Sequence, residues 1–305
     1  MKLGYLFSGQ GKQFDEMGQD LYQQEPVYRQ TIDQASEALN MDMSDATVFD
    51  NPVNIQVAIV AMSTGIERII NQDFGDPVGA TGLSLGEYSA IVAAKGLDFS
   101  DALQLVRDRS HYMDQAGQDH PGKMAAVLKT TADMVDQAVK VGSKKGEIYA
   151  ANYNTDSQIV IGGSIEGLQA ATDYLHEHGV KRVVPLKMTV ASHTPFMQEA
   201  SDLLAKRIQD VSFNQLAFPV ISNTTSQPFE VNTIKQTLID QLINPTHFYN
   251  CIQQLTQLGV DTVVELGPGD TLMKFAKNVV ANDHTFHIDS VKTLNDFRSK
   301  AKLVK

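Results

Sequence analysis

The sequence predicts an α/β fold with a mostly parallel sheet and a smaller inserted subdomain. Buried strands alternate with helical segments and short links over most of the 305 residues, which is typical of parallel sheets. Between residues 122 and 188 the element order changes to β-α-β-β-α-β, the ferredoxin-like pattern. A chain of this length can hold one large domain that carries an insertion. We therefore expect an α/β body over residues 1–121 and 189–305 and a ferredoxin-like insert over 122–188.

Composition places the chain among ordinary globular proteins and excludes several function classes. Hydrophobic residues make up 42% and charged residues 20%, and the formal net charge is −11 with a pI near 5.1. This acidity argues against nucleic acid as a main partner. The apolar start of the chain is too short for a secretory signal, and no run predicts a membrane span. The single cysteine, Cys251, fits a buried structural thiol in a reducing compartment, so we expect a cytoplasmic protein.

The first part of the body contains a strand, a glycine-rich loop and several helices. A buried strand is predicted over Leu3–Phe7, and the loop 8–13 follows it. The loop lacks the glycine spacing and the Lys-Ser/Thr pair of a P-loop, but open α/β sheets bind ligands at such strand ends. Helices are predicted at about 25–39 and 53–70, a strand at 77–80, and further helices up to residue 117.

The insert and the rest of the body continue the alternation. In the insert, the predicted strands are 123–128, 148–152, 158–161 and 181–186, and the predicted helices are 132–141 and 165–178. In the body, helices are predicted at 195–209, 231–242 and 248–258, strands at 219–222 and 262–266, and a further helix opening at Gly269-Asp270. The end of the chain, 292–305, is predicted to be a surface helix or a frayed tail.

Residues 82–88, Gly-Leu-Ser-Leu-Gly-Glu-Tyr, contain a G-x-S-x-G motif at a predicted strand-to-helix turn. The glycines two residues before and after Ser84 allow a sharp, strained turn that exposes the serine hydroxyl. Such a turn also directs the Leu85 N–H toward negative charge that develops on an attacked carbonyl. Ser84 is therefore a candidate nucleophile. A glycine-flanked serine in an ordinary turn is the alternative.

A serine nucleophile needs a base, and His193 is the best candidate. It follows the insert and precedes a predicted helix, in a loop of the kind that holds catalytic bases in many folds. A surface histidine is the alternative. His176 and His178 lie two residues apart on a predicted helix, so they do not share a face as metal ligands would. We predict no metal site.

Arg109 carries the most informative charge in the sequence. On a helical wheel over residues 101–115 it lies at about 240°, inside the apolar arc that holds Leu105 and Met113. A guanidinium directed into a core needs a fixed anion, and its planar fork suits a carboxylate. The partner is either an internal acid, which would make the pair structural, or the carboxylate of a substrate.

Seven segments together resemble the malonyl-CoA:acyl carrier protein transacylase family, in the family's order and over about residues 2 to 280. They are Phe7-Ser8-Gly9-Gln10-Gly11, the stretch 82–90 around Ser84, Leu105-Val106 with Arg109, 122–127, Ser192-His193, Asn244-Pro245, and Glu265-Leu266-Gly267-Pro268-Gly269. The resemblance implies a hydrolase-like α/β body with a ferredoxin-like insert, which agrees with the element order above.

The resemblance also implies a role for each site residue. Ser84 would attack the malonyl-CoA thioester, and His193 would act as base and then as acid. The N–H groups of Gln10 and Leu85 would form the oxyanion hole. Arg109 would hold the malonyl carboxylate, with Gln10 and His247 also contacting substrate. A backbone carbonyl near 246–247 would orient the histidine, and no cofactor would be needed because the CoA thioester is itself a substrate.

Two positions depart from the family's usual pattern in ways that bear on the pocket. Leu83 precedes the nucleophile where the family often has histidine. Ser192 precedes His193, and related polyketide acyltransferases with a small residue there can accommodate an α-methyl group. A methylene of pocket space is worth only about 1–3 kcal/mol, so selectivity for malonyl over methylmalonyl stays a hypothesis.

The implied partners are malonyl-CoA and acyl carrier protein, and we expect a monomer that binds neither nucleic acid nor membrane. Carrier protein is acidic in this family's systems, so docking would need a local basic patch. Lys181, Arg182 and Lys187 on the insert, or Lys12, are candidates, and scattered solvated charges are the alternative. Rival functions are a standalone polyketide-type acyltransferase with another extender unit, a serine thioesterase or hydrolase, and a non-catalytic carrier-binding module.

Overall fold

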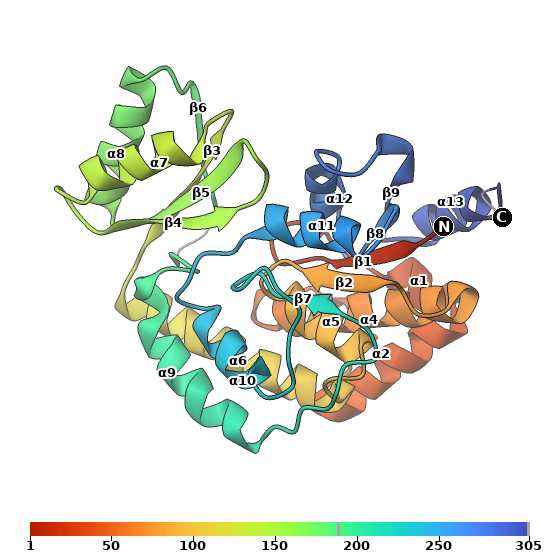
Figure 1. Cartoon of the computed structure of the whole chain (residues 1–305). Coiled ribbons are helices and arrows are strands. Elements are labelled where there is room, and N and C mark those ends of the chain that lie inside the picture. Colours follow the sequence, from red (N-terminus) through yellow and green to blue (C-terminus); the bar gives the residue numbers. More distant parts are fainter. Residues whose placement is uncertain (188–189, 304–305) are drawn as a thin grey trace. The chain divides into compact units, whose positions relative to one another are not determined.

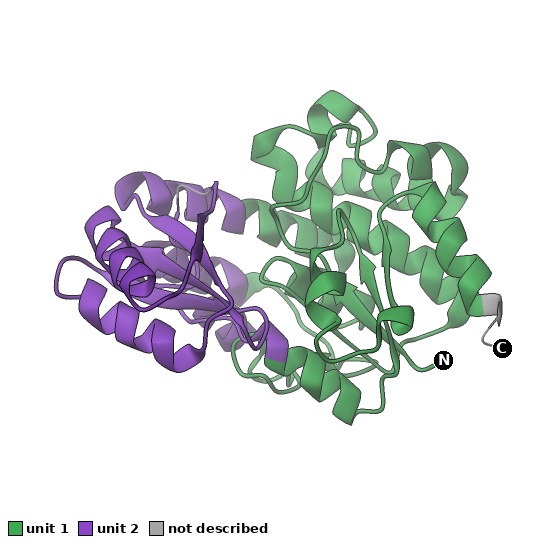
Figure 2. Cartoon of the chain, turned by 90° about the horizontal axis from the view of Figure 1, so that it is seen from above, with its two compact units in different colours: residues 1–108, 210–234, 250–305 green, residues 109–209, 235–249 purple. Residues whose placement is uncertain are grey.

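The computed structural model describes residues 1–187 and 190–303 and divides the chain into two units (Figure 2). The first comprises 1–108, 210–234 and 250–305, and the second comprises 109–209 and 235–249. The expected insert, 122–188, falls inside the second unit, which also takes in flanking segments on both sides. Residues 188 and 189, at the expected boundary between the insert and the body, lie outside the described residues.

The first unit is built on a five-stranded sheet in which every pair of neighbours is parallel. The sheet order is β7-β2-β1-β8-β9, and the strands are β1 (Leu3–Phe7), β2 (Gly79–Gly82), β7 (Val220–Ile221), β8 (Thr262–Leu266) and β9 (Thr285–Ile288). All residues of β1 and β8 are buried, because helices lie on both faces of the sheet (Figure 1). The predicted mostly parallel α/β sheet is confirmed.

The helices of the first unit pack around this sheet, and α4 (Ile55–Phe74) is its buried core helix. By length and composition the stretch Pro52–Phe74 could cross a membrane, but 83% of its apolar 18-residue window is buried inside the protein, so its apolar character is explained by the core. The other helices are α1 (Gln19–Gln24), α2 (Pro26–Leu39), α3 (Ala46–Phe49), α5 (Gly86–Ala93), α6 (Phe99–Asp119, continuing into the second unit), α11 (Phe248–Gln257), α12 (Thr271–Ala276) and α13 (Val291–Leu303).

The last helix, α13, is packed into the first unit and is not a frayed tail. Phe297 is 1% exposed and makes edge contacts with Phe74 and Phe286, with ring centroids 5.4 and 5.2 Å apart. Two ion pairs add to this aromatic packing, because Arg298 contacts both Glu25 and Asp73 at 2.7 Å. Of the two alternatives predicted for 292–305, a surface helix or a frayed tail, the described part of this segment has the helix, and one face of that helix is buried against the first unit.

The second unit contains a four-stranded antiparallel sheet in the order β4-β5-β3-β6. Its elements follow one another as β3 (Lys123–Leu128), α7 (Ala132–Gly142), β4 (Ile148–Tyr153), β5 (Gln158–Gly163), α8 (Ile165–Glu177) and β6 (Arg182–Pro185), and α9 (Gln198–Arg207) and most of α10 (Ile234–Asp240) complete the unit. Val127, Ile161 and Leu175 belong to the apolar core between the sheet and its two helices. Thr131 and Ser164 cap α7 and α8 with side-chain hydrogen bonds.

Candidate active site

Ser84 lies in a tight turn between β2, which ends at Gly82, and α5, which begins at Gly86. Its φ of 53° is in the left-handed region, which non-glycine residues seldom adopt. A Cβ on Gly82 would collide with the backbone of Gly86, and a Cβ on Gly86 would collide with the carbonyl of Phe7. These close approaches explain why the turn needs glycine on both sides of the serine. The predicted strained strand-to-helix turn is confirmed.

Asn223 holds this turn from the neighbouring strand, and sequence reasoning missed it. Its Oδ1 accepts a hydrogen bond from the Ser84 N–H at 2.8 Å, and its Nδ2 donates to the Gly82 carbonyl at 2.7 Å. Its own N–H donates to the carboxylate of Glu87. Asn223 is fully buried just beyond β7, which pairs with β2. No local pattern marks this asparagine, because its partners lie more than a hundred residues away in the chain.

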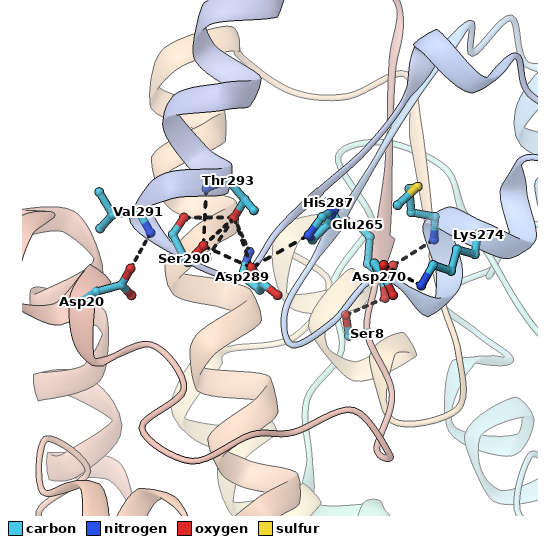
Figure 3. A network of polar contacts seen from close by, with 11 residues as sticks. Ser8, Asp20, Glu265, Asp270, Lys274, His287, Asp289, Ser290, Val291 and Thr293 are labelled. Atoms are coloured by element: carbon cyan, nitrogen blue, oxygen red, sulfur yellow. Dashed lines mark hydrogen bonds and ion pairs between the residues drawn. The ribbon is translucent and has the colours of Figure 1, made fainter.

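The loop that carries Gln10 leaves β1 beside the end of β8. Glu265, which is 1% exposed, accepts hydrogen bonds from the Ser8 hydroxyl at 3.0 Å and from the Met273 N–H of α12 at 2.8 Å. Figure 3 shows Glu265 directed toward Ser8. Burial raises the pKa of this carboxyl to about 8. From the other side, Gln56 of α4 donates its side-chain amide to the Oε1 of Gln10 at 3.3 Å.

His193 is a buried residue of the second unit. It is 4% exposed, and its Nδ1 lies 2.8 Å from the carbonyl oxygen of Gln241. Because a carbonyl only accepts, the neutral ring carries its proton on Nδ1 and leaves Nε2 free to accept another. Burial lowers the pKa of His193 to about 4, and the Arg109 charge adds to this. The orienting carbonyl belongs to Gln241, so the expectation of one near 246–247 is wrong.

Arg109 lies on α6 and is 1% exposed, which confirms its predicted place on the buried side of the helix. Its Nη2 donates to the side-chain oxygen of Gln241 at 3.1 Å. Gln241 therefore contacts His193 through its backbone and Arg109 through its side chain, and it is fully buried. Sequence reasoning missed Gln241 because it placed the orienting carbonyl a few residues further along the chain.

His247 is half-buried and stacks on Tyr153 of β4, with ring centroids 4.9 Å apart and planes 8° from parallel. Burial lowers its pKa. The preceding residue, Thr246, fixes this position because its N–H donates to the carbonyl of Ala151 and its carbonyl accepts from the N–H of Tyr153. His247 is thus held against the small sheet, next to an aromatic face.

Two further residues singled out in the sequence are buried. Ser192 is 5% exposed, and its hydroxyl contacts the Met124 sulfur at 3.6 Å. Cys251 lies on α11, and its thiol donates to the carbonyl of Ser222 at 3.3 Å. Burial, together with the nearby Glu87 charge, raises the pKa of that thiol to about 12. Cys251 is therefore the inert structural thiol that the sequence predicts.

The predicted site residues are divided between the two units. Ser84, Leu85 and Gln10 belong to the first, and His193 and Arg109 to the second, together with His247. Within the first unit the structure supplies a strained serine at the start of a helix. Within the second it supplies a neutral imidazole with an oriented proton and a buried guanidinium, both connected through Gln241.

Comparisons with known proteins agree with one another over nearly the whole chain. The family model described as acyl transferase domain matches residues 4–294. A malonyl CoA-acyl carrier protein transacylase of Bacillus subtilis is 34% identical over 301 residues, covering 96% of this chain and 95% of that protein. The protein of the same name from Escherichia coli K12 is 31% identical, covering 92% and 93%.

Solved structures give the same answer at the level of the fold. The crystal structure of MCAT from Streptococcus pneumoniae is similar with a TM-score of 0.93 and 37% identity, covering 98% of this chain and all of that one. A malonyl-transacylase in complex with a type II PKS acyl-carrier protein has a TM-score of 0.89 and 30% identity, covering 97% and 98%. Sequence and structure together show that this chain is an acyltransferase that belongs to the malonyl-CoA:acyl carrier protein transacylase family.

Proposed function

We propose that this protein transfers the malonyl group of malonyl-CoA to the phosphopantetheine thiol of acyl carrier protein in fatty-acid biosynthesis. Its membership of the transacylase family supports this function. The observation that carries the chemistry is the strained turn at Ser84, whose φ of 53° is typical of a serine nucleophile at a strand-to-helix turn.

In the first half-reaction, the Ser84 hydroxyl attacks the thioester carbonyl of malonyl-CoA while Nε2 of His193 takes the hydroxyl proton. The tetrahedral intermediate collapses as the bond between carbonyl carbon and sulfur breaks. His193 then returns the proton to the leaving thiolate, which departs as coenzyme A. The product is a malonyl-serine ester, and the enzyme has regained its neutral imidazole.

In the second half-reaction, the carrier's thiol gives its proton to His193 and attacks the ester carbonyl. The carbon–oxygen bond to Ser84 breaks, and the serine recovers its proton from the imidazolium. Because the first product leaves before the second substrate reacts, the kinetics are ping-pong. A dyad is sufficient, since the Gln241 carbonyl fixes the proton of His193 on Nδ1 in the place that a carboxylate takes in a triad.

The oxyanion of each intermediate is stabilised by the N–H groups of Leu85 and Gln10. Leu85 is the N-cap residue of α5, where backbone N–H groups and the helix dipole favour negative charge. The Ser84 N–H is already bonded to Asn223, so the contribution of this turn has to come from a later amide. Gln10 is placed by the bonds of Ser8 to Glu265 and of its own side chain to Gln56.

Arg109 binds the free carboxylate of the malonyl group. Its guanidinium is buried, and Gln241 orients one of its nitrogens, so a fork of donors is preorganised for a planar anion. His247 contacts the substrate beside it, with its ring orientation fixed by the stack on Tyr153. No cofactor takes part, because the activated acyl group arrives as a thioester.

We interpret the small antiparallel sheet with α7 and α8 as a ferredoxin-like insert over 122–188, on the basis of its element order and its strand order. The protein acts in the cytoplasm as a monomer. Methylmalonyl-CoA is the alternative donor that deserves testing, because the residue before His193 is the small Ser192. Rates with malonyl-CoA, methylmalonyl-CoA and acetyl-CoA separate a fatty-acid enzyme from a polyketide-type one.

Mass spectrometry of the intact protein after mixing with malonyl-CoA tests the function directly. A single malonyl adduct on the peptide that contains Ser84 is expected, and it disappears on addition of holo acyl carrier protein. Ser84→Ala removes the adduct, whereas Ser89→Ala, which changes a buried serine on the helix α5 that follows the turn, keeps it. No adduct in the wild-type protein, or an adduct that survives Ser84→Ala, contradicts the mechanism. Loss of the adduct to water faster than to carrier indicates a hydrolase.

A further inference from the structure

Asn223 has a side chain that is bonded on both sides of the nucleophile, to Gly82 and to Ser84. We propose that Asn223 is a positioning residue that keeps the Ser84 turn in its reactive shape, an inference that rests on the proposed function. Its amide spans the turn from the Gly82 carbonyl to the Ser84 N–H, with bonds of 2.7 and 2.8 Å. The side chain thus fixes the two peptide groups from which the serine projects.

The turn needs such a restraint because its backbone is strained. Ser84 has a φ of 53°, and a residue other than glycine persists in this region only when its surroundings over-determine the conformation. Elsewhere the turn is held by helix-type bonds further along, from the Gly86 N–H to the Leu83 carbonyl and from the Glu87 N–H to the Ser84 carbonyl. On the strand side of the serine, the Leu83 N–H donates to the Phe7 carbonyl at 3.2 Å, and Asn223 adds the side-chain bonds that hold both Gly82 and Ser84.

Asn223 is itself held from several directions. Its N–H donates to the carboxylate of Glu87, a fully buried residue in the first turn of α5. Its Nδ2 also lies 3.7 Å from the sulfur of Cys251, whose thiol donates to the adjacent Ser222 carbonyl. Glu87 thereby joins the asparagine backbone to the helix that follows the nucleophile. These bonds form a clamp around the turn: Glu87 holds the backbone of Asn223, and the side chain of Asn223 holds the backbone of Ser84.

We expect Asn223 to increase the rate of the chemical step and to leave the affinity for substrate unchanged. The position of the Ser84 hydroxyl and the direction of the Leu85 N–H both follow from the backbone of this turn. A displacement of about 1 Å of catalytic groups can cost about 100-fold in rate. The hydrogen bonds of Asn223 go to Gly82, Ser84, Glu87 and Cys251, none of which we assign to binding of the malonyl carboxylate. Loosening the clamp should therefore lower the rate of acylation and leave binding of malonyl-CoA nearly unchanged.

Asn223→Asp is the sharpest variant, because it keeps the size and one acceptor oxygen for the Ser84 N–H. It loses the donor to the Gly82 carbonyl when the new carboxyl is ionised, and regains it when the carboxyl is protonated. Burial and the nearby Glu87 raise the pKa of such a carboxyl. The variant should therefore recover activity, relative to wild type at the same pH, as pH falls from about 8.5 to about 5.5. A merely destabilised protein has no reason to recover in acid.

The experiment measures single-turnover malonylation of Ser84 across this pH range in wild type, Asn223→Asp and Thr285→Val. Thr285→Val is the matched control, because it removes a different buried side-chain bond, to the Asn282 carbonyl, in the same unit. At about pH 8 the aspartate variant is expected to be slower by about 100-fold with an unchanged KM for malonyl-CoA. The control should acylate at the wild-type rate.

An aspartate variant that acylates at the wild-type rate, or whose deficit is constant with pH, overturns the proposal. If that variant does not fold, Glu87→Met removes the acceptor of the Asn223 N–H and so loosens the clamp from its other side. A lower acylation rate at unchanged KM then supports the proposal, and an unchanged rate overturns it. Wild type serves as the reference for the function itself. If Ser84 of the wild-type protein takes up no malonyl group, the proposed function is wrong. If the wild type and the variants are all malonylated at the same rate, only the proposed role of Asn223 is wrong.

Discussion

At the scale of single residues, the surroundings that keep His193 neutral for catalysis also make the folded protein less stable in acid. The imidazole is buried and lies near the Arg109 charge, and these two causes lower its pKa to about 4, although the hydrogen bond that Nδ1 donates to the Gln241 carbonyl opposes the shift. The ring is therefore neutral, as a general base must be, over the whole range in which the protein is normally handled. Protonation becomes unfavourable in the folded state but not in the unfolded state.

We predict that His193 makes the protein less stable as pH falls below about 6.5. The folded-state pKa is near 4 and the unfolded value is 6.5, so between these values the unfolded chain binds a proton that the folded one does not. The full stability is present above pH 6.5, and about 3 kcal/mol is lost by pH 4. Thermal unfolding of wild type and His193→Gln across this range measures it. The variant should show a flatter dependence, and parallel curves would contradict the assignment.

Arg109 should decide which acyl group is transferred. Arg109→Met keeps much of the length of the side chain but removes the charge and the donors. A hydrogen bond to a charged group is worth about 1.5–3 kcal/mol, so transfer of malonyl should fall by about 10- to 100-fold more than transfer of acetyl. Kinetics with malonyl-CoA and acetyl-CoA on the same preparation provide an internal control. Equal losses for both donors would mean that the arginine is structural.

Some residues of the candidate site could be predicted from the sequence, and others could not. Periodicity along α6 was enough to place Arg109 in the interior, because a helix dictates which side chains share a face. The glycines around Ser84 predicted its strained turn for an equally local reason. Asn223 and Gln241 were missed, since the first meets Ser84 only because β7 lies beside β2, and the second meets His193 across 48 residues of chain. Contacts made by sheet pairing and packing leave no mark in a short segment.

At the scale of elements, apolar runs predicted every strand of the two sheets except β9, which lies at one edge of the sheet of the first unit. The bounds of β1, β3 and β8 agree with the prediction, since each is a short hydrophobic run. β9 (Thr285–Ile288) was not predicted. It has only one neighbour, β8, and two of its four residues are only partly buried, so its composition does not differ from that of a loop.

The helix that follows β9 should contribute much of the stability of the first unit. Phe297 of α13 is in contact with Phe74 and Phe286, and removing a buried aromatic ring costs about 3–5 kcal/mol. Phe297→Ala is therefore expected to lower the midpoint of urea unfolding clearly. Lys292→Ala, on the exposed face of the same helix, should change stability by less than about 0.5 kcal/mol. Equal midpoints for the two variants would contradict the packing role of α13.

At the scale of the whole molecule, charge is distributed unequally between the two units. Residues 109–209 and 235–249 contain 12 Lys and Arg and 12 Asp and Glu, whereas the remaining residues contain 13 and 24. All of the net charge of −11 thus belongs to the first unit. An acidic protein partner is repelled by such a surface and meets no net repulsion on the second unit.

Exposed cations gather at one end of the β3–β6 pair, where an acidic carrier could dock. Arg182 pairs with Leu128, so Lys181 and Lys129 follow at the same end of the ladder, and all three cations are exposed. We predict that Lys181→Glu with Arg182→Glu raises the KM for carrier about 5-fold or more at low salt, and less at high salt, because like charges then oppose docking.

The rate of Ser84 malonylation by malonyl-CoA should stay the same in this double variant, since no carrier takes part in that step. Lys144→Glu with Lys145→Glu is the control, because it makes the same charge change at exposed positions beyond α7. If both pairs raise the KM equally, the effect is one of overall charge. If neither does, the carrier docks elsewhere.

The buried thiol of Cys251 has a practical consequence for following these events in solution. Its burial and its pKa of about 12 keep it from reacting with maleimide or iodoacetamide reagents at neutral pH. A cysteine introduced at an exposed site next to Lys129, such as Ser157, whose carbonyl accepts from the Thr130 N–H, would then be the one reactive thiol, without any need to replace the native residue. A fluorophore attached there could report the arrival of carrier protein in real time on an otherwise unaltered enzyme.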